Sequence, residues 1–155
     1  MLRIVQKTIP LPAGAVGLAL EADAIRVIGA NQAAASAYLS RVRDAWSDIV
    51  REAAKHEIYQ RATAAFKTIN EELAEAKEAE ALGVPPPAGR SSEELQERLD
   101  AGRAAFKEIY GAVSAAATVA DINAALEAAR ERGLTWLVPE HWEPYVEACP
   151  WTLAS

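Results

Sequence analysis

The segment His56-Glu57-Ile58-Tyr59-Gln60 places an imidazole beside a carboxylate on a predicted helix, which resembles the start of a zinc-binding pattern. A zinc helix of this kind carries a second imidazole one turn further on, and position 60 is Gln. A di-iron carboxylate site needs Glu three residues before His, whereas Glu52 lies four before His56. We therefore expect no metal ion and no cofactor. His56 is interpreted as a polar residue in a helix-packing seam.

A cluster of glutamates near the end of the same predicted helix could in principle do acid–base chemistry. Paired carboxylates act as acid and base when burial separates their pKa values. The cluster comprises Glu71, Glu72, Glu75, Glu78 and Glu80. These residues are interleaved with Ala and Lys77, which is typical of a solvated helix face.

A nucleophilic site would have to use Cys149, with His141 nearby. A reactive thiolate needs an electropositive setting, and Glu140, Glu143 and Glu147 supply the opposite. The chain has no glycine-rich phosphate-binding motif and no nucleophile elbow. We expect no catalytic residue and no small-molecule substrate.

The composition favours packed helices over a thick globular core. Hydrophobic residues make up 51% of the 155-residue chain, and 35 residues are Ala, which favours helix but buries little apolar surface. Residues 1–68 carry 9 Lys and Arg against 6 Asp and Glu, and residues 69–155 carry 7 against 16. Because phosphate binding needs clustered cations, the acidic second half argues against a nucleic-acid partner.

The single cysteine, Cys149, cannot form an internal disulfide, which fits a reducing compartment. The alternative is a signal peptide, because Arg3 and Lys7 precede an apolar stretch and Ala22-Asp23-Ala24 imitates a cleavage site. Prolines 10 and 12 interrupt that stretch, and no run approaches the roughly 20 apolar residues of a membrane span. We expect a cytoplasmic protein, or one within a virus particle made there, without a membrane partner.

Residues 1–30 form the first predicted region, a small β-hairpin or extended segment. Leu2 to Val5, Val16 to Leu20 and Ala24 to Ile28 predict two or three short strands, with the hairpin turn at Glu21 to Ala24. The alternative is that Leu18 to Ile28 extends the following helix.

Residues 31–133 form the second predicted region, which is helical. From Asn31, a predicted N-cap, to Leu82 there is no Pro or Gly. The apolar seam is Leu39, Val42, Trp46, Ile49, Ala53, His56, Tyr59, Ala62, Phe66, Ile69, Leu73 and Ala76. Its heptad spacing has one three-residue stammer around His56 to Ala62. An unbroken helix would span about 78 Å, so we expect either a break near the stammer or an elongated molecule.

The segment Gly83 to Gly89 must end this helix, because Gly83 supplies a C-cap and three prolines follow. Ser91 and Ser92 begin a second helix, with the seam Leu95, Leu99, Gly102, Phe106, Ile109, Val113 and Ala116. The two seams predict an antiparallel, coiled-coil-like helical hairpin, in which Phe66, Ile69 and Leu73 face Leu95, Leu99, Phe106 and Ile109. A third helix starts at Thr118 and ends at Gly133, with the stripe Val119, Ile122, Leu126 and Ala129.

Residues 134–155 form the third predicted region, an irregular aromatic tail interrupted by prolines. Trp is enriched both in small cores and at docking sites, so the rings either pack within the chain or bind a partner. The candidate partner-binding residues are Trp136, Trp142, Tyr145 and Trp151 in the tail, with Leu39, Val42, Trp46 and Ile49 on the part of the long helix that the shorter second helix leaves uncovered.

A mainly α-helical chain without a catalytic motif indicates a non-enzymatic structural or assembly protein. It would act by coiled-coil packing and terminal docking segments, as a homo-oligomer or with a protein partner, for example as an accessory component of a virus particle. The alternative is a small acidic cytoplasmic regulator, such as an inhibitor, adaptor or chaperone, that sequesters one protein partner. An enzyme using His56 or Cys149 would lack a second catalytic group.

Overall fold

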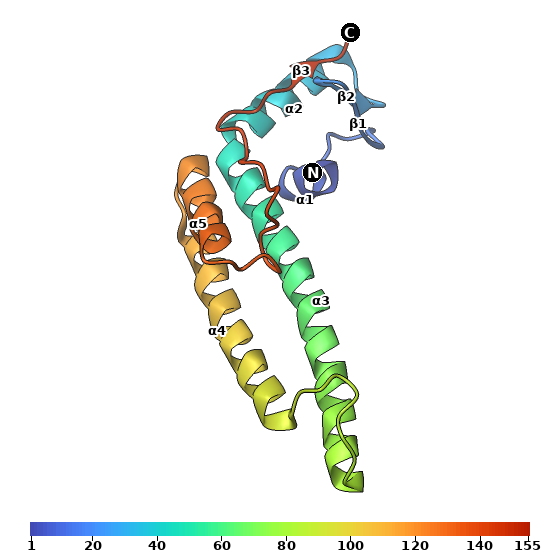
Figure 1. Ribbon diagram of the computed structural model, residues 1–155. Helices are drawn as coiled ribbons and strands as arrows, with labels where there is room; N and C mark the ends of the chain where they lie inside the picture. The colour runs from blue at the N-terminus through green and yellow to red at the C-terminus, as the bar shows by residue number, and fades with distance from the viewer. The chain divides into compact units, whose positions relative to one another are not determined.

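The computed structural model describes residues 1–155 and is mainly helical, as predicted. Its elements are α1 (Leu2–Thr8), β1 (Gly17–Glu21), β2 (Ala24–Ile28), α2 (Gln32–Asp44), α3 (Trp46–Leu82), α4 (Ser92–Ala115), α5 (Val119–Glu131) and β3 (Thr152–Leu153) (Figure 1). The chain forms two compact units, each built from separate segments. The first comprises residues 1–54, 116–124 and 143–155, and the second comprises 55–115 and 125–142.

The first unit contains a three-stranded sheet in the order β1-β2-β3. β1 and β2 form the predicted antiparallel hairpin, with Gly17 opposite Ile28 and Glu21 opposite Ala24. Ala22 in the turn has a φ of 52°, which costs a non-glycine residue conformational energy. The aromatic tail was expected to be irregular, but β3 at its end pairs parallel to β2, with Ile25 opposite Leu153. The tail therefore completes the sheet.

The prediction of a strand at Leu2 to Val5 is wrong, because these residues lie in helix α1. A short apolar run of β-branched residues does not distinguish a strand from a buried helical turn. In α1 the run places Val5 in the core, and the Tyr38 hydroxyl donates to the carbonyl of Ile9 (2.7 Å) just after the helix. Packing of one helical face thus overrides the strand propensity of the individual residues.

The predicted N-cap is confirmed, since the Asn31 side chain accepts from the Ala34 amide (2.8 Å) at the start of α2. The helix is interrupted at Ala45 and not at the predicted stammer, through which α3 runs without a break. No Gly or Pro marks this position. The interruption directly precedes Trp46, whose indole is buried and donates to the carbonyl of Val146 (3.0 Å).

The predicted seam of α3 is wrong in its middle. His56 and Tyr59 are exposed, whereas Ala54 and Ile58 are buried between Val50 and Ala62. The buried positions thus repeat every four residues here, and each step of four turns the stripe about 40° around the helix. Heptad spacing assumes that the buried stripe stays on one face of the helix. In this part of α3 the buried stripe changes face.

The antiparallel hairpin of α3 and α4 is confirmed in the second unit. Leu73 and Ala76 of α3 form one hydrophobic cluster with Leu95 and Leu99 of α4, and Phe66 and Ile69 pack against it. Gly83 ends α3 with a φ of 71°, and the amides of Gly83 and Val84 donate to the carbonyls of Glu80 and Ala79, as in a Schellman motif. Coiled-coil packing itself stays a prediction.

Helix α5 has the predicted cap and stripe. The Thr118 hydroxyl accepts from the Asp121 amide (3.1 Å), and Val119, Ile122, Leu126 and Ala129 are buried. None of the helices is long and apolar enough to cross a membrane.

Candidate interaction surfaces

The candidate residues of α2 and the start of α3 are covered by the chain itself. Leu39, Val42, Trp46 and Ile49 are all buried in the first unit. Trp151 is only 6% exposed, and its ring meets that of Trp46 edge-on at 5.3 Å between centroids. The Arg43 guanidinium donates to the carbonyl of Trp151 (3.0 Å). Partner binding by these residues stays a prediction, and within the single chain they form core.

Tyr145 is half-buried, and its backbone is held by one side chain of α5. The Asn123 amide donates to the carbonyl of Tyr145 (2.9 Å), and its oxygen accepts from the Tyr145 amide (2.9 Å). A side-chain amide that pairs with both the N–H and the C=O of one residue replaces the pairing that a strand neighbour would give. This bond pair fixes the tail within the first unit.

The remaining candidates, Trp136 and Trp142, are half-buried in the second unit. The centroid of the Trp136 ring lies 5.5 Å from the centroid of the Phe66 ring on α3. The backbone before it is tied down because the Arg61 guanidinium donates to the carbonyl of Thr135 (3.0 Å). The structure thus separates the tail tryptophans: Trp151 belongs to the first unit, and Trp136 to the second.

An aromatic cluster that the sequence analysis did not identify as a site lies along α3 and α4. The ring of Phe106 on α4 packs near three other aromatic rings. The distances between ring centroids are 6.4 Å to Tyr59, 6.2 Å to Phe66 and 5.3 Å to Tyr110. Tyr59 is 57% exposed, which is high for a large hydrophobic side chain. The exposed position was missed because the heptad seam placed Tyr59 inside.

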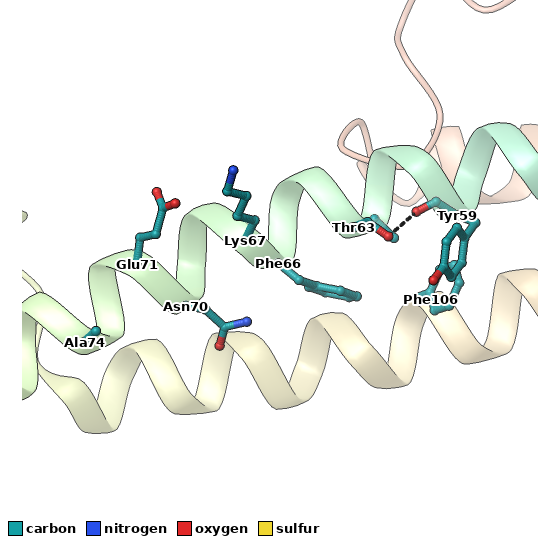
Figure 2. Close-up of a pocket in the computed structure, with 9 residues that line it drawn as sticks. Tyr59, Thr63, Phe66, Lys67, Asn70, Glu71, Ala74 and Phe106 are labelled. Atoms are coloured by element: carbon teal, nitrogen blue, oxygen red, sulfur yellow. Dashed lines mark hydrogen bonds between the residues drawn. The ribbon is translucent and has the colours of Figure 1, made fainter.

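Beside this cluster runs a groove of about 700 Å³, shown in Figure 2. Its lining is Tyr59, Ala62, Thr63, Phe66, Lys67, Asn70, Glu71 and Ala74 of α3, with Phe106 of α4. A second hollow of about 570 Å³ in the same unit shares Phe66 and is lined by small residues of α4, with Arg98 and Trp136. Concave, mostly apolar surfaces of this kind are where partners and ligands dock.

The side chains considered for chemistry include no cluster of metal ligands. No group of three or more His, Cys, Asp and Glu side chains is placed to hold a metal ion, and His56 is exposed. Of the glutamate cluster, all but the half-buried Glu72 are exposed. Glu80 has a structural role: its carboxylate accepts from the Ser92 amide (2.9 Å) and hydroxyl (2.7 Å), and these bonds lower the pKa of Glu80.

A second carboxylate with a lowered pKa is Glu127 on α5, because the Arg130 guanidinium donates to it one turn along the helix. This ion pair lies on the surface of a helix and is a common stabilising contact. Neither Glu80 nor Glu127 is among the residues that line the two hollows described above.

Comparison of the chain with protein-family models, with curated proteins and with solved structures found no match to any of them.

Proposed function

We propose that the protein is a non-enzymatic structural or assembly protein that works by protein–protein association. The observation that carries this proposal is the apolar groove beside the exposed ring of Tyr59 on the α3–α4 hairpin. Exposed aromatic residues next to a concave apolar surface are typical of the centre of protein interfaces. A component of a larger particle, such as a virus particle, would use a surface of this kind.

The acidity of the second half supports the same class of function. Glu71 lines the groove, and Glu75 and Glu78 follow it on the exposed surface of α3. Charges around an apolar contact select the partner and its orientation more than they add affinity. An interaction surface with an apolar centre and charged surroundings therefore has both the driving force and the specificity that assembly requires.

The sharpest test removes the exposed ring without touching the core. In Tyr59→Ser the fold should persist, since the ring is mostly exposed, and association should weaken. The matched control is Tyr110→Ser, because Tyr110 belongs to the same aromatic cluster but does not line the groove. Association is measured by light scattering and the fold by circular dichroism. Equal loss of association in the two variants, or no loss in either, would contradict the assignment of the groove.

The second candidate function is an acidic regulator that sequesters one protein, favoured by the exposed glutamates at the end of α3. The two functions differ in the state of the pure protein. A structural role predicts a symmetric oligomer of this chain alone, whereas a regulator remains a monomer until its target is added. Sedimentation of the pure protein distinguishes them.

A further inference from the structure

The flank of α3 that lines the groove in Figure 2 carries two neighbouring rows of residues spaced by four. One row is Tyr59, Thr63, Lys67 and Glu71, and the other is Ala62, Phe66, Asn70 and Ala74. Residues four apart form a ridge along a helix, and ridges of this type from two helices interdigitate in the commonest mode of helix packing. The ridges and grooves of this flank are therefore suited to packing against another helix.

The charges on this flank are complementary to a copy of themselves. In Figure 2 the side chains of Lys67 and Glu71 lie one turn apart, both point away from α4, and neither bonds to another residue drawn. Both are exposed, and neither has an ion-pair partner within the chain. In a two-fold symmetric contact, residue i of one copy meets residue j of the other and the reverse. An antiparallel copy of α3 would therefore place Lys67 opposite Glu71 twice.

The apolar lining supplies the attraction that these two charges cannot give alone. The rings of Tyr59, Phe66 and Phe106 offer apolar surface, and the small residues Ala62 and Ala74 allow a close approach of a second backbone. A parallel arrangement of the two copies would bring Lys67 to Lys67 and is disfavoured by like-charge repulsion. The charges consequently select one orientation.

We propose that the protein forms a two-fold symmetric homodimer through this flank, with α3 of the two copies antiparallel and the Lys67–Glu71 pair made twice. The inference rests on the proposed function, because it names a second copy of the chain as the partner at the same groove. It adds the register and the direction of the contact.

Charge reversal tests the reciprocal pairing on the full chain. Lys67→Glu and Glu71→Lys each convert two attractive contacts into two repulsive ones, so each variant alone should dimerise about tenfold or more weakly than the wild type. An equimolar mixture of the two variants should form a heterodimer, because one copy then presents two carboxylates and the other two ammonium groups. The double variant Lys67→Glu/Glu71→Lys should recover the homodimer. Masses are measured by light scattering after size exclusion.

Matched controls separate this pairing from a change in net charge. Lys107→Glu and Glu97→Lys make the same charge changes at exposed positions of α4 outside the groove, and both should dimerise like the wild type. If the wild type dimerises and the groove variants behave like these controls, the dimer uses another surface and only this inference fails. Weakened single variants that do not recover on mixing would also overturn it. A wild type that stays monomeric would contradict both this inference and the structural role.

Discussion

Individual side chains hold the tail of this protein in place, and Asn123 is the clearest example. Its amide pairs with both the N–H and the C=O of Tyr145, a half-buried residue. The caps of the helices belong to the same scale, since Asn31, Ser91 and Thr118 each accept from an amide three residues on. The caps could be predicted because capping depends on adjacent residues only. The Asn123 bonds could not, since they join residues 22 positions apart.

Asn123→Ala should lower the free energy of unfolding by about 1–3 kcal/mol, because it leaves a partly buried donor and acceptor of the backbone without partners. The control is Asn70→Ala, an exposed helical site in the groove, which should change stability by less than about 0.5 kcal/mol. Urea denaturation of the two variants provides the comparison. Equal effects would show that the amide bonds to Tyr145 do not hold the tail.

Trp151→Ala should cost about 3–5 kcal/mol, because it empties a buried site against the ring of Trp46. Trp142→Ala, at a half-buried position, should cost clearly less. Thermal midpoints of both variants test this order. A Trp151→Ala protein with wild-type stability and weakened association would instead assign Trp151 to partner docking.

At the scale of elements, the patterns that stay on one helix face were predicted correctly and those that change face were not. The seam of α4 and the stripe of α5 agree with the buried positions, and Gly102 and Phe106 are half-buried. In α3 the stripe turns around the helix between Trp46 and Ala62, so a fixed repeat misplaced His56 and Tyr59. The pairing of β3 with β2 had no local signal, because only two residues of the tail take part.

The connection between α3 and α4 should be sensitive to acid through Glu80. Hydrogen bonds from Ser92 lower its pKa below the ordinary value of 4.5 in the folded state. A carboxylate whose pKa is lower in the folded than in the unfolded state stabilises the fold at pH values above its unfolded-state pKa. This stabilisation disappears as the pH falls through its folded-state pKa. The stability difference between wild type and Glu80→Gln should therefore be largest near neutral pH and shrink below about pH 4.5. Urea midpoints at several pH values measure it, and a difference that grows in acid would contradict the role of Glu80.

The hairpin of β1 and β2 contains a strained turn residue whose replacement should be stabilising. Ala22 has a positive φ, which glycine adopts without steric cost, so Ala22→Gly should raise stability by about 0.5–1 kcal/mol. The same replacement within β1, Ala19→Gly, should lower stability by about 0.5–1 kcal/mol. Calorimetric midpoints that shift in the same direction for both variants would argue against strain at Ala22.

At the scale of the whole molecule, the sequence predicted a mainly helical chain with a hairpin of helices and a small β-element, and the structure agrees at that level. The candidate partner-binding residues show the limit of this reasoning. The short second helix leaves Leu39, Val42, Trp46 and Ile49 uncovered, and the sequence does not decide between covering by the chain itself and covering by a partner; in the structure the chain itself buries them. The groove on α3 was not anticipated, since it depends on which residues of α3 stay exposed beside α4 in the second unit.

Sedimentation velocity of the purified full chain, over a wide range of concentration and at two salt concentrations, tests most directly the claim that this protein works by association. We predict a sedimentation coefficient that rises with concentration toward that of a dimer. The rise should be smaller at high salt, because ions screen the exposed Lys67 and Glu71 charges. A coefficient that stays at the monomer value at every concentration would contradict the claim.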